Sequence, residues 1–162
     1  MKLALALALL ARVAWAEPIT IHGDDIAWRL DLPPGWEAAD PPELPAGRAL
    51  AAYTSDGRQL LVARLRINTD GAYDGKSAYF AGVEDGVQKE TLSYHRLAGG
   101  AHKLGKRRRL PAFDLWYRGE RAIHGARFVF LRGYVVVLRI DLPEARTVER
   151  AAKRLLESFQ PG

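Results

Sequence analysis

Alternation of apolar and polar residues is the main pattern of this chain, and it predicts β-strands with one buried face. The predicted strands are residues 19–22, 27–32, 50–54, 59–67, 92–97, 103–110, 113–118, 123–131 and 134–140. In 128–131 and 134–138 both alternating faces are apolar, which is typical of central strands covered on both sides. The sheet therefore needs a layer above it and a layer below it.

Turn residues divide these strands. Residues 55–58 read Ser-Asp-Gly-Arg, and Asp-Gly between two alternating runs predicts a β-hairpin because glycine adopts positive φ without steric cost. Glycines at 99–100 and Pro111 are further predicted breaks. The chain is thus expected to form a sequence of short antiparallel strands.

Between residues 77 and 91 the apolar period changes to that of a helix. One face of this segment carries Phe80, Val83 and Val87. Gly82 and Gly86 are also four residues apart, and we expect them to form a small-residue surface against the sheet. This segment is the first predicted covering helix.

A second helix is predicted from Leu142 to Phe159. Pro143 suits its first turn, and Glu149 with Lys153 has the spacing of an i, i+4 ion pair. Its apolar face holds Val148, Ala152, Leu155 and Phe159. Two amphipathic helices and an antiparallel sheet predict an α+β fold, with helices covering the sheet in an α/β/α sandwich.

The first sixteen residues have the pattern of a secretory signal peptide. Lys2 supplies the positive charge, residues 3–10 the apolar core, and Ala14-Trp15-Ala16 a small-x-small cleavage site. We expect cleavage after Ala16, a single domain over residues 17–162, and a periplasmic or secreted protein. No apolar stretch reaches the roughly 20 residues that span a bilayer, so no membrane-spanning segment is expected.

The cysteine content and the net charge limit the bonds and partners that can be expected of this chain. The chain has no cysteine, so neither a disulfide, nor a thiolate metal site, nor an acylated cysteine is expected. The leader holds two of the 24 basic residues and none of the 19 acidic ones, so its removal lowers the formal net charge from +5 to +3. A net charge of +3 is too small to indicate, by itself, what kind of partner the protein binds.

A basic segment between residues 91 and 110 contains no acidic residue. Its cations are Arg96, Lys103, Lys106, Arg107, Arg108 and Arg109. Such clustering creates a positive field that attracts an anionic envelope component or an acidic protein. Alternatively, the charges only protect an edge strand from pairing with other chains. Nucleic acid is not an expected partner of an exported protein.

Motifs for catalysis or metal binding are incomplete. Residues 100–106 begin like a phosphate-binding loop, but Arg107 stands where serine or threonine is required. No serine lies in a G-x-S-x-G elbow. The isolated histidines, the Asp24-Asp25 pair and the oxygen-rich segment 68–75 lack metal-site spacing, and turn chemistry accounts for the acidic groups. No catalytic residue, metal or cofactor is therefore expected.

The order of these segments resembles the PsbP-like superfamily, including exported proteins of the DcrB type. The resemblance covers most of residues 17–162 and rests on Leu-Pro-Pro-Gly-Trp at 32–36, Leu-Trp-Tyr at 115–117, Gly-Tyr-Val-Val at 133–136 and Glu-Ser-Phe at 157–159. It implies an α/β/α sandwich and a role as an assembly factor or extrinsic subunit. It supplies no catalytic residue.

We therefore expect an exported, non-catalytic binding or assembly accessory protein of the cell envelope. The alternative is a hydrolase, or a protein that binds a small apolar ligand among its tryptophans and tyrosines. A deep cleft that gathers a histidine with a serine or carboxylate would favour the hydrolase.

Overall fold

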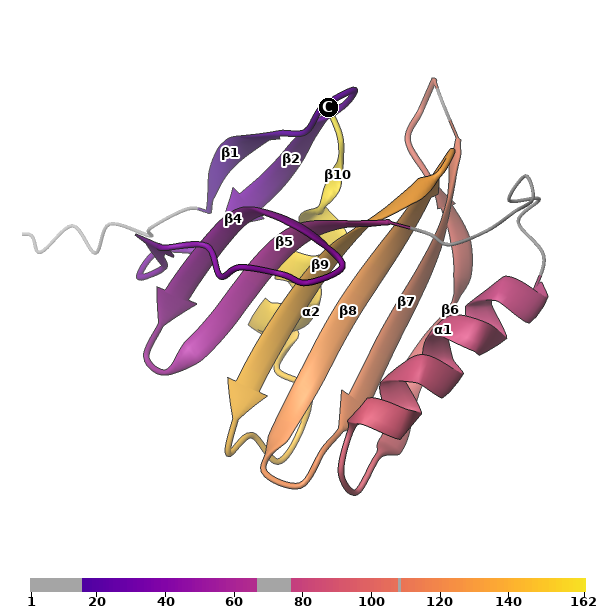
Figure 1. The fold of residues 1–162 in the computed structure, drawn as a ribbon. Coiled ribbons are helices and arrows are strands. Elements are labelled where there is room, and N and C mark those ends of the chain that lie inside the picture. Colours follow the sequence, from indigo (N-terminus) through magenta and orange to yellow (C-terminus); the bar gives the residue numbers. More distant parts are fainter. Residues whose placement is uncertain (1–15, 67–76, 108) are drawn as a thin grey trace, which may run out of the picture.

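The computed structural model describes residues 16–66, 77–107 and 109–162, which form strands and two helices (Figure 1). The helices are α1 (Ser77–Glu90) and α2 (Arg150–Ser158). The strands are β1 (Glu17–His22), β2 (Ala27–Leu32), β3 (Glu37–Ala39), β4 (Gly47–Ser55), β5 (Arg58–Arg66), β6 (His95–Leu104), β7 (Leu110–Arg118), β8 (Ala122–Leu131), β9 (Tyr134–Pro143) and β10 (Gln160–Pro161).

These elements form three layers. A seven-stranded antiparallel sheet has the order β3-β4-β5-β9-β8-β7-β6, and a small sheet has the order β1-β2-β10. Helix α1 lies on one face of the large sheet, and α2 with the small sheet lies on the other (Figure 1). The predicted α+β class and α/β/α sandwich are confirmed. Within the described residues, no helix is long and apolar enough to cross a membrane.

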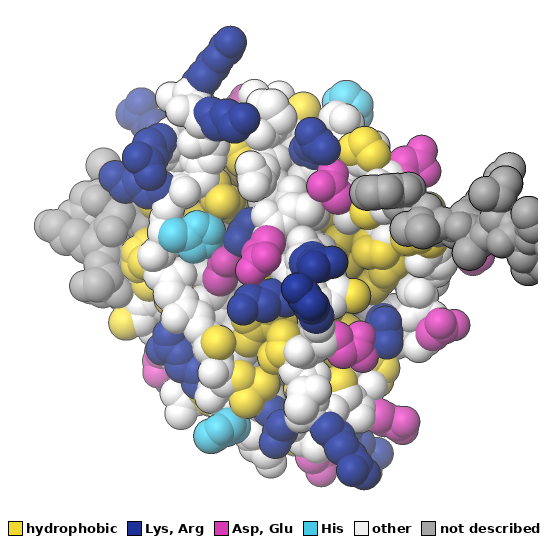
Figure 2. Space-filling view, turned by 180° about the vertical axis from the view of Figure 1, so that it is seen from behind, with side chains coloured by type: hydrophobic (Ala, Val, Ile, Leu, Met, Phe, Trp, Pro, Cys, Tyr) yellow, Lys and Arg dark blue, Asp and Glu magenta, His cyan; other side chains and the backbone are white. Residues whose placement is uncertain are grey.

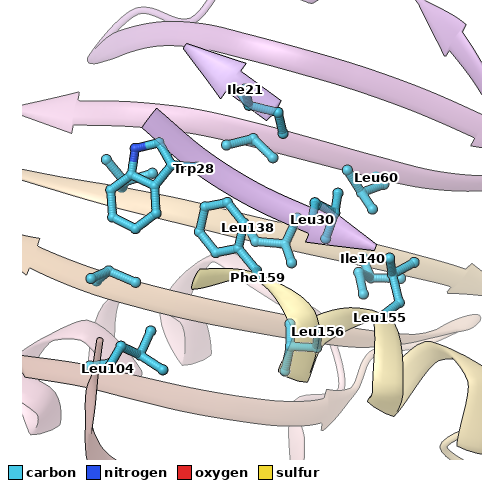
Figure 3. Packing of buried hydrophobic residues seen from close by; sticks show 14 of the residues in the cluster. Ile21, Trp28, Leu30, Leu60, Leu104, Leu138, Ile140, Leu155, Leu156 and Phe159 are labelled. Carbon is cyan, nitrogen blue, oxygen red and sulfur yellow. The ribbon is translucent and has the colours of Figure 1, made fainter. Parts of the chain in front are cut away.

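The larger core fills the space between the sheet, α2 and the small sheet (Figure 3). Trp28 of β2 stacks on Phe159 with ring centroids 5.0 Å apart, and both residues are buried. Leu155 and Leu156 of α2 bury against the same cluster. Because the small sheet meets α2 here, residues near both ends of the described chain contribute to one core.

The second core lies under α1. Phe80 stacks on Phe113 with ring centroids 5.3 Å apart and meets Phe130 edge-on at the same distance. Val83 and Val87 pack against this cluster, as the helical spacing predicts. Strands β8 and β9 contribute to both cores, which explains why both of their faces are apolar.

The Asp-Gly hairpin is confirmed. Ser55 pairs with Arg58, while Asp56 and Gly57 have φ of 46° and 76°. Two consecutive left-handed residues match the twist of the strands that they join. The turn therefore determines the β4–β5 register locally.

Helix α2 begins at Arg150 rather than at Leu142. Strand β9 continues to Pro143, which pairs with Ala122, because β8 offers a partner along that whole length. The Glu149 carboxylate lies 3.0 Å from Arg58, so the predicted pair with Lys153 is wrong. Cross-strand pairing thus prevailed over the local helix signal of proline.

Two further expectations are corrected. Gly99 and Gly100 do not interrupt the sheet but lie inside β6, and residues 105–107 and 109 lie outside the strands, in the connection between β6 and β7. Gly82 and Gly86 do not pack against the sheet, since a Cβ on either would meet open space. The apolar face of α1 instead contacts the sheet through its larger side chains.

Gly125 provides a test of the larger core. A Cβ added there would overlap the buried ring of Trp116 on β7. We expect Gly125→Ala to lower the free energy of unfolding by about 1–3 kcal/mol, the usual cost of overpacking. Urea denaturation would measure this loss. Gly100→Ala is the matched control, because a Cβ there has open space, and equal stability losses in both variants would contradict the assignment.

Candidate functional site

The basic segment lies in and beside the turn that joins β6 to β7. Leu104 and Leu110 flank this turn and are both buried in the larger core, so they hold the loop against the sheet. Lys106, Arg107 and Arg109 are exposed between them. Arg108 lies outside the described residues. We call Lys106, Arg107 and Arg109 the basic tip.

The cations of the basic tip form no ion pair within the described residues. Exposed Lys103 on β6 forms none there either. Some arginines elsewhere are ion-paired: Arg48 and Arg64 with Asp24, and Arg139 with Asp141. Figure 2 shows Lys and Arg side chains gathered at its upper left, where the β6–β7 turn lies.

Arg96 does not belong to the basic tip. It lies near the opposite end of β6, seven residues before Lys103, which is about 23 Å along a strand. Its guanidinium binds the Glu84 carboxylate of α1 at 2.8 Å and the carbonyl of Gly99 at 3.2 Å. The structure therefore divides the predicted patch into a paired residue that attaches α1 and an unpaired tip.

A surface cavity of about 620 Å³ lies beside the basic tip. Gly105, Lys106 and Arg107 line it from the turn, and Arg29 and Asp31 line it from β2. Ser158 and residues 160–162 complete the wall. Sequence reasoning missed Arg29, because it is an isolated arginine in an ordinary alternating strand.

The β2 wall of this cavity is held in place by hydrogen bonds. The Ser158 hydroxyl accepts from the Asp31 backbone N–H at 3.1 Å and donates to the Leu155 carbonyl at 2.8 Å. The Nε and Nη2 atoms of Arg29 each lie 3.2 Å from one Asp31 oxygen. The end of α2 and strand β2 thus form one supported surface.

Beneath this region, Arg127 joins the end of α2 to the sheet. Arg127 is 4% exposed, and its guanidinium donates to both Asp114 oxygens at 2.7 Å. It also donates to the carbonyls of Glu157 and Phe159 at 3.1 and 3.0 Å. His102 Nε2 comes within 3.0 Å of Asp114 without hydrogen-bond geometry. The Arg127 guanidinium thus satisfies carbonyls at the end of α2 that have no partner within the helix.

A row of polar side chains crosses the α1 side of the large sheet. From β7 to β3 it consists of the directly paired residues Tyr117, His124, Asp141, Gln59, Thr54 and Glu37. Each of these residues is unremarkable in its own strand. Only the register of non-adjacent segments places them side by side.

The centre of this row is an ion-paired cluster. His124 Nδ1 donates to Asp141 at 2.5 Å, Arg139 Nε donates to the same oxygen at 2.8 Å, and the His124 ring stacks on Tyr117. Burial by itself raises the pKa of Asp141, but the hydrogen bond from His124 and the charge of Arg139 together lower it below its ordinary value. Burial raises the pKa of Tyr117.

A cavity of about 470 Å³ lies over part of this row. Arg139, Asp141 and Thr54 line it, and the Thr54 hydroxyl donates to the Arg58 carbonyl at 3.2 Å. Neither a serine nor His124 is among the described residues that line it. The cluster thus pairs a histidine with a carboxylate, but among the described residues that line the cavity Asp141 appears without His124, so this cavity does not gather the two groups.

The other sequence candidates have structural partners. Asp24 binds Arg48 and Arg64, and Asp25 accepts from the Tyr134 hydroxyl at 3.0 Å. No group of acidic or histidine side chains suited to a metal occurs among the described residues. The segment 68–75 and most of the leader lie outside them. Trp28 and Trp116 are buried in the core.

The described residues form an α+β fold in which an antiparallel sheet lies between one helix and a layer made of a helix and a small sheet (Figure 1). The solution structure of cyanobacterial PsbP (CyanoP) from Synechocystis sp. PCC 6803 is similar to this chain, with a TM-score of 0.60. The similarity covers 96% of this chain and 99% of that chain at 15% sequence identity, so it shows the fold alone. No protein-family model and no curated protein matches the sequence.

The Asp141 cluster leads to a pH prediction. A carboxyl whose pKa is lowered by folding adds stability above its unfolded pKa of about 3.9, and this stability is lost as the pH falls through the folded pKa. We expect Asp141→Asn to reduce the free energy of unfolding at pH 7 and to flatten its decline below about pH 4. Urea unfolding between pH 2 and 7 would measure both effects.

Asp40→Asn is the control for this measurement. Asp40 is exposed at the same cavity and forms no ion pair within the described residues. If Asp40→Asn changed the decline of the free energy of unfolding below about pH 4 as much as Asp141→Asn does, the ion-paired cluster would not be the cause of that decline.

Proposed function

We propose that this protein is an exported, non-catalytic accessory protein of the cell envelope that binds an anionic component through the basic tip. The observation that carries the proposal is the gathering of exposed cations in one turn, where Lys106, Arg107 and Arg109 form no ion pair with any described residue. Unpaired surface cations leave a positive field in the solvent. An anionic surface or an acidic protein would be attracted to that field.

The geometry of the turn supports this role. Buried Leu104 and Leu110 anchor its two ends, so the charges are presented by a supported loop. Exposed Arg132, in the β8–β9 turn, adds a cation at the same end of the sheet. The PsbP-like fold and the accessory role implied by the sequence resemblance agree with binding rather than catalysis.

Export rests on the leader pattern and is tested separately. Expression of the full chain in a Gram-negative bacterium should give a periplasmic protein whose first residue, by mass spectrometry, is Glu17. Cleavage should require small residues at Ala14 and Ala16. An intact cytoplasmic chain would contradict the export proposal and leave the basic tip to be tested by binding.

Binding is tested by co-sedimentation with vesicles. The protein should sediment with phosphatidylglycerol vesicles at low salt and not with phosphatidylcholine vesicles, because each basic residue near an anionic surface contributes about 1 kcal/mol. Neutralising Lys106, Arg107 and Arg109 to glutamine should weaken binding by roughly 100-fold. Added salt should reduce binding of the parent protein.

The matched control neutralises three exposed cations that lie away from the basic tip, Arg121, Arg146 and Arg150. This variant has the same net charge as the basic-tip variant and should bind nearly as well as the parent. Equal losses in the two variants would show that net charge, and not the basic tip, drives binding. No binding by the parent would direct the search to acidic proteins.

A further inference from the structure

The cavity of about 620 Å³ brings together cations that are far apart in the sequence. Lys106 and Arg107 line it from the β6–β7 turn, while Arg29 lines it from β2, more than seventy residues earlier. Asp31 is the carboxylate side chain among its lining residues. These lining side chains therefore carry two net positive charges, and they surround a concave space instead of a flat surface.

We propose that this cavity is a binding site for a phosphate group. The inference rests on the proposed function and deepens it, because it names the chemistry that the basic tip recognises. Guanidinium groups bind phosphate oxygens through paired N–H donors, and lysine adds a point charge. Arg107 and Lys106 would contact the phosphate from the turn, and Arg29 would contact it from the opposite wall.

Arg29 retains the donors that such a contact needs. A guanidinium has five N–H donors, and the bonds from Nε and Nη2 to Asp31 are long, at 3.2 Å. Its side chain is 60% exposed. Arg29 can therefore bind a phosphate oxygen while Asp31 keeps its orientation.

The walls of the cavity are supported before a ligand arrives. Strand β2 pairs with β1 on one side and with β10 on the other, and Ser158 holds the Asp31 backbone. Arg127 secures the neighbouring carbonyl of Phe159. A supported site loses less conformational entropy on binding than a set of free side chains.

The size of the cavity suits a phosphate ester, since small-molecule sites commonly measure about 300–1,000 Å³. Two sources would supply this chemistry: a phospholipid headgroup and a soluble phosphate ester. Among the described residues, the exposed large apolar side chain is that of Leu92, on the loop after α1. The basic tip carries no such residue, so binding to a lipid would be peripheral and would not need insertion.

The test uses sn-glycerol 3-phosphate as a soluble probe and phosphatidylglycerol vesicles as a lipid probe. Backbone amide resonances of the purified protein are followed during titration with the soluble probe. We expect saturable shifts at Gly105 and Arg29, and Arg29→Gln should weaken this binding about tenfold, the usual effect of losing a charged hydrogen bond. Arg29→Lys should restore part of the affinity. Arg121→Gln is the matched control and should bind as the parent does.

Vesicle binding separates the two sources. If Arg29→Gln weakens binding both to glycerol 3-phosphate and to phosphatidylglycerol vesicles, the site takes a lipid headgroup. If it weakens only the soluble probe, the site takes a soluble ester. Vesicles whose negative charge comes from oleate in phosphatidylcholine should bind less well than phosphatidylglycerol vesicles of equal charge.

Different results would contradict the phosphate site and the proposed function. No saturable shift with glycerol 3-phosphate would overturn the phosphate site, even if vesicle binding still required Lys106, Arg107 and Arg109. In that case the basic tip would act as a general charged surface. Loss of vesicle binding with an intact response to glycerol 3-phosphate would instead overturn the membrane role and keep the phosphate site.

Discussion

Strands β8 and β9 carry apolar side chains on both faces, and the need to bury both faces is the constraint on which the rest of the structure depends. Helix α1 buries one face, and α2 with the small sheet buries the other. The β1–β2 hairpin, extended only by the two residues of β10, depends on this packing, since an isolated two-stranded hairpin is at best marginally stable in water. The stacking of Trp28 on Phe159 joins the small sheet to α2 in this shared core.

This packing also builds the candidate site. Burial of Phe159 brings the end of α2 beside β2, and burial of Leu104 and Leu110 fixes the turn that carries the basic tip. Arg127 completes the arrangement: it is ion-paired with Asp114 and donates hydrogen bonds to the carbonyls of Glu157 and Phe159 at the end of α2. Core packing therefore forms the cavity between these parts. Its charged residues can be seen in the sequence, but their proximity cannot.

Local signals predicted the elements well where short-range physics decides the outcome. The Asp56-Gly57 turn and the helical spacing of Phe80, Val83 and Val87 are both confirmed. Predictions failed where a distant partner decides. Pro143 suits a helix start, but pairing with Ala122 keeps it in β9. Gly99 suggests a break, yet it stays within β6, where the adjacent strand comes close.

The sequence by itself determined the strand alternation, the presence of two covering helices and the basic composition of the segment around residues 103–109, because each depends on residues that are neighbours in the chain. Only the tertiary structure decided that Arg29 joins Lys106 and Arg107, that Arg96 pairs with Glu84, and that a polar row crosses the sheet. The physical reason is register. A shift of one residue reverses which face each side chain occupies, and that register is determined by core packing between segments far apart in the chain.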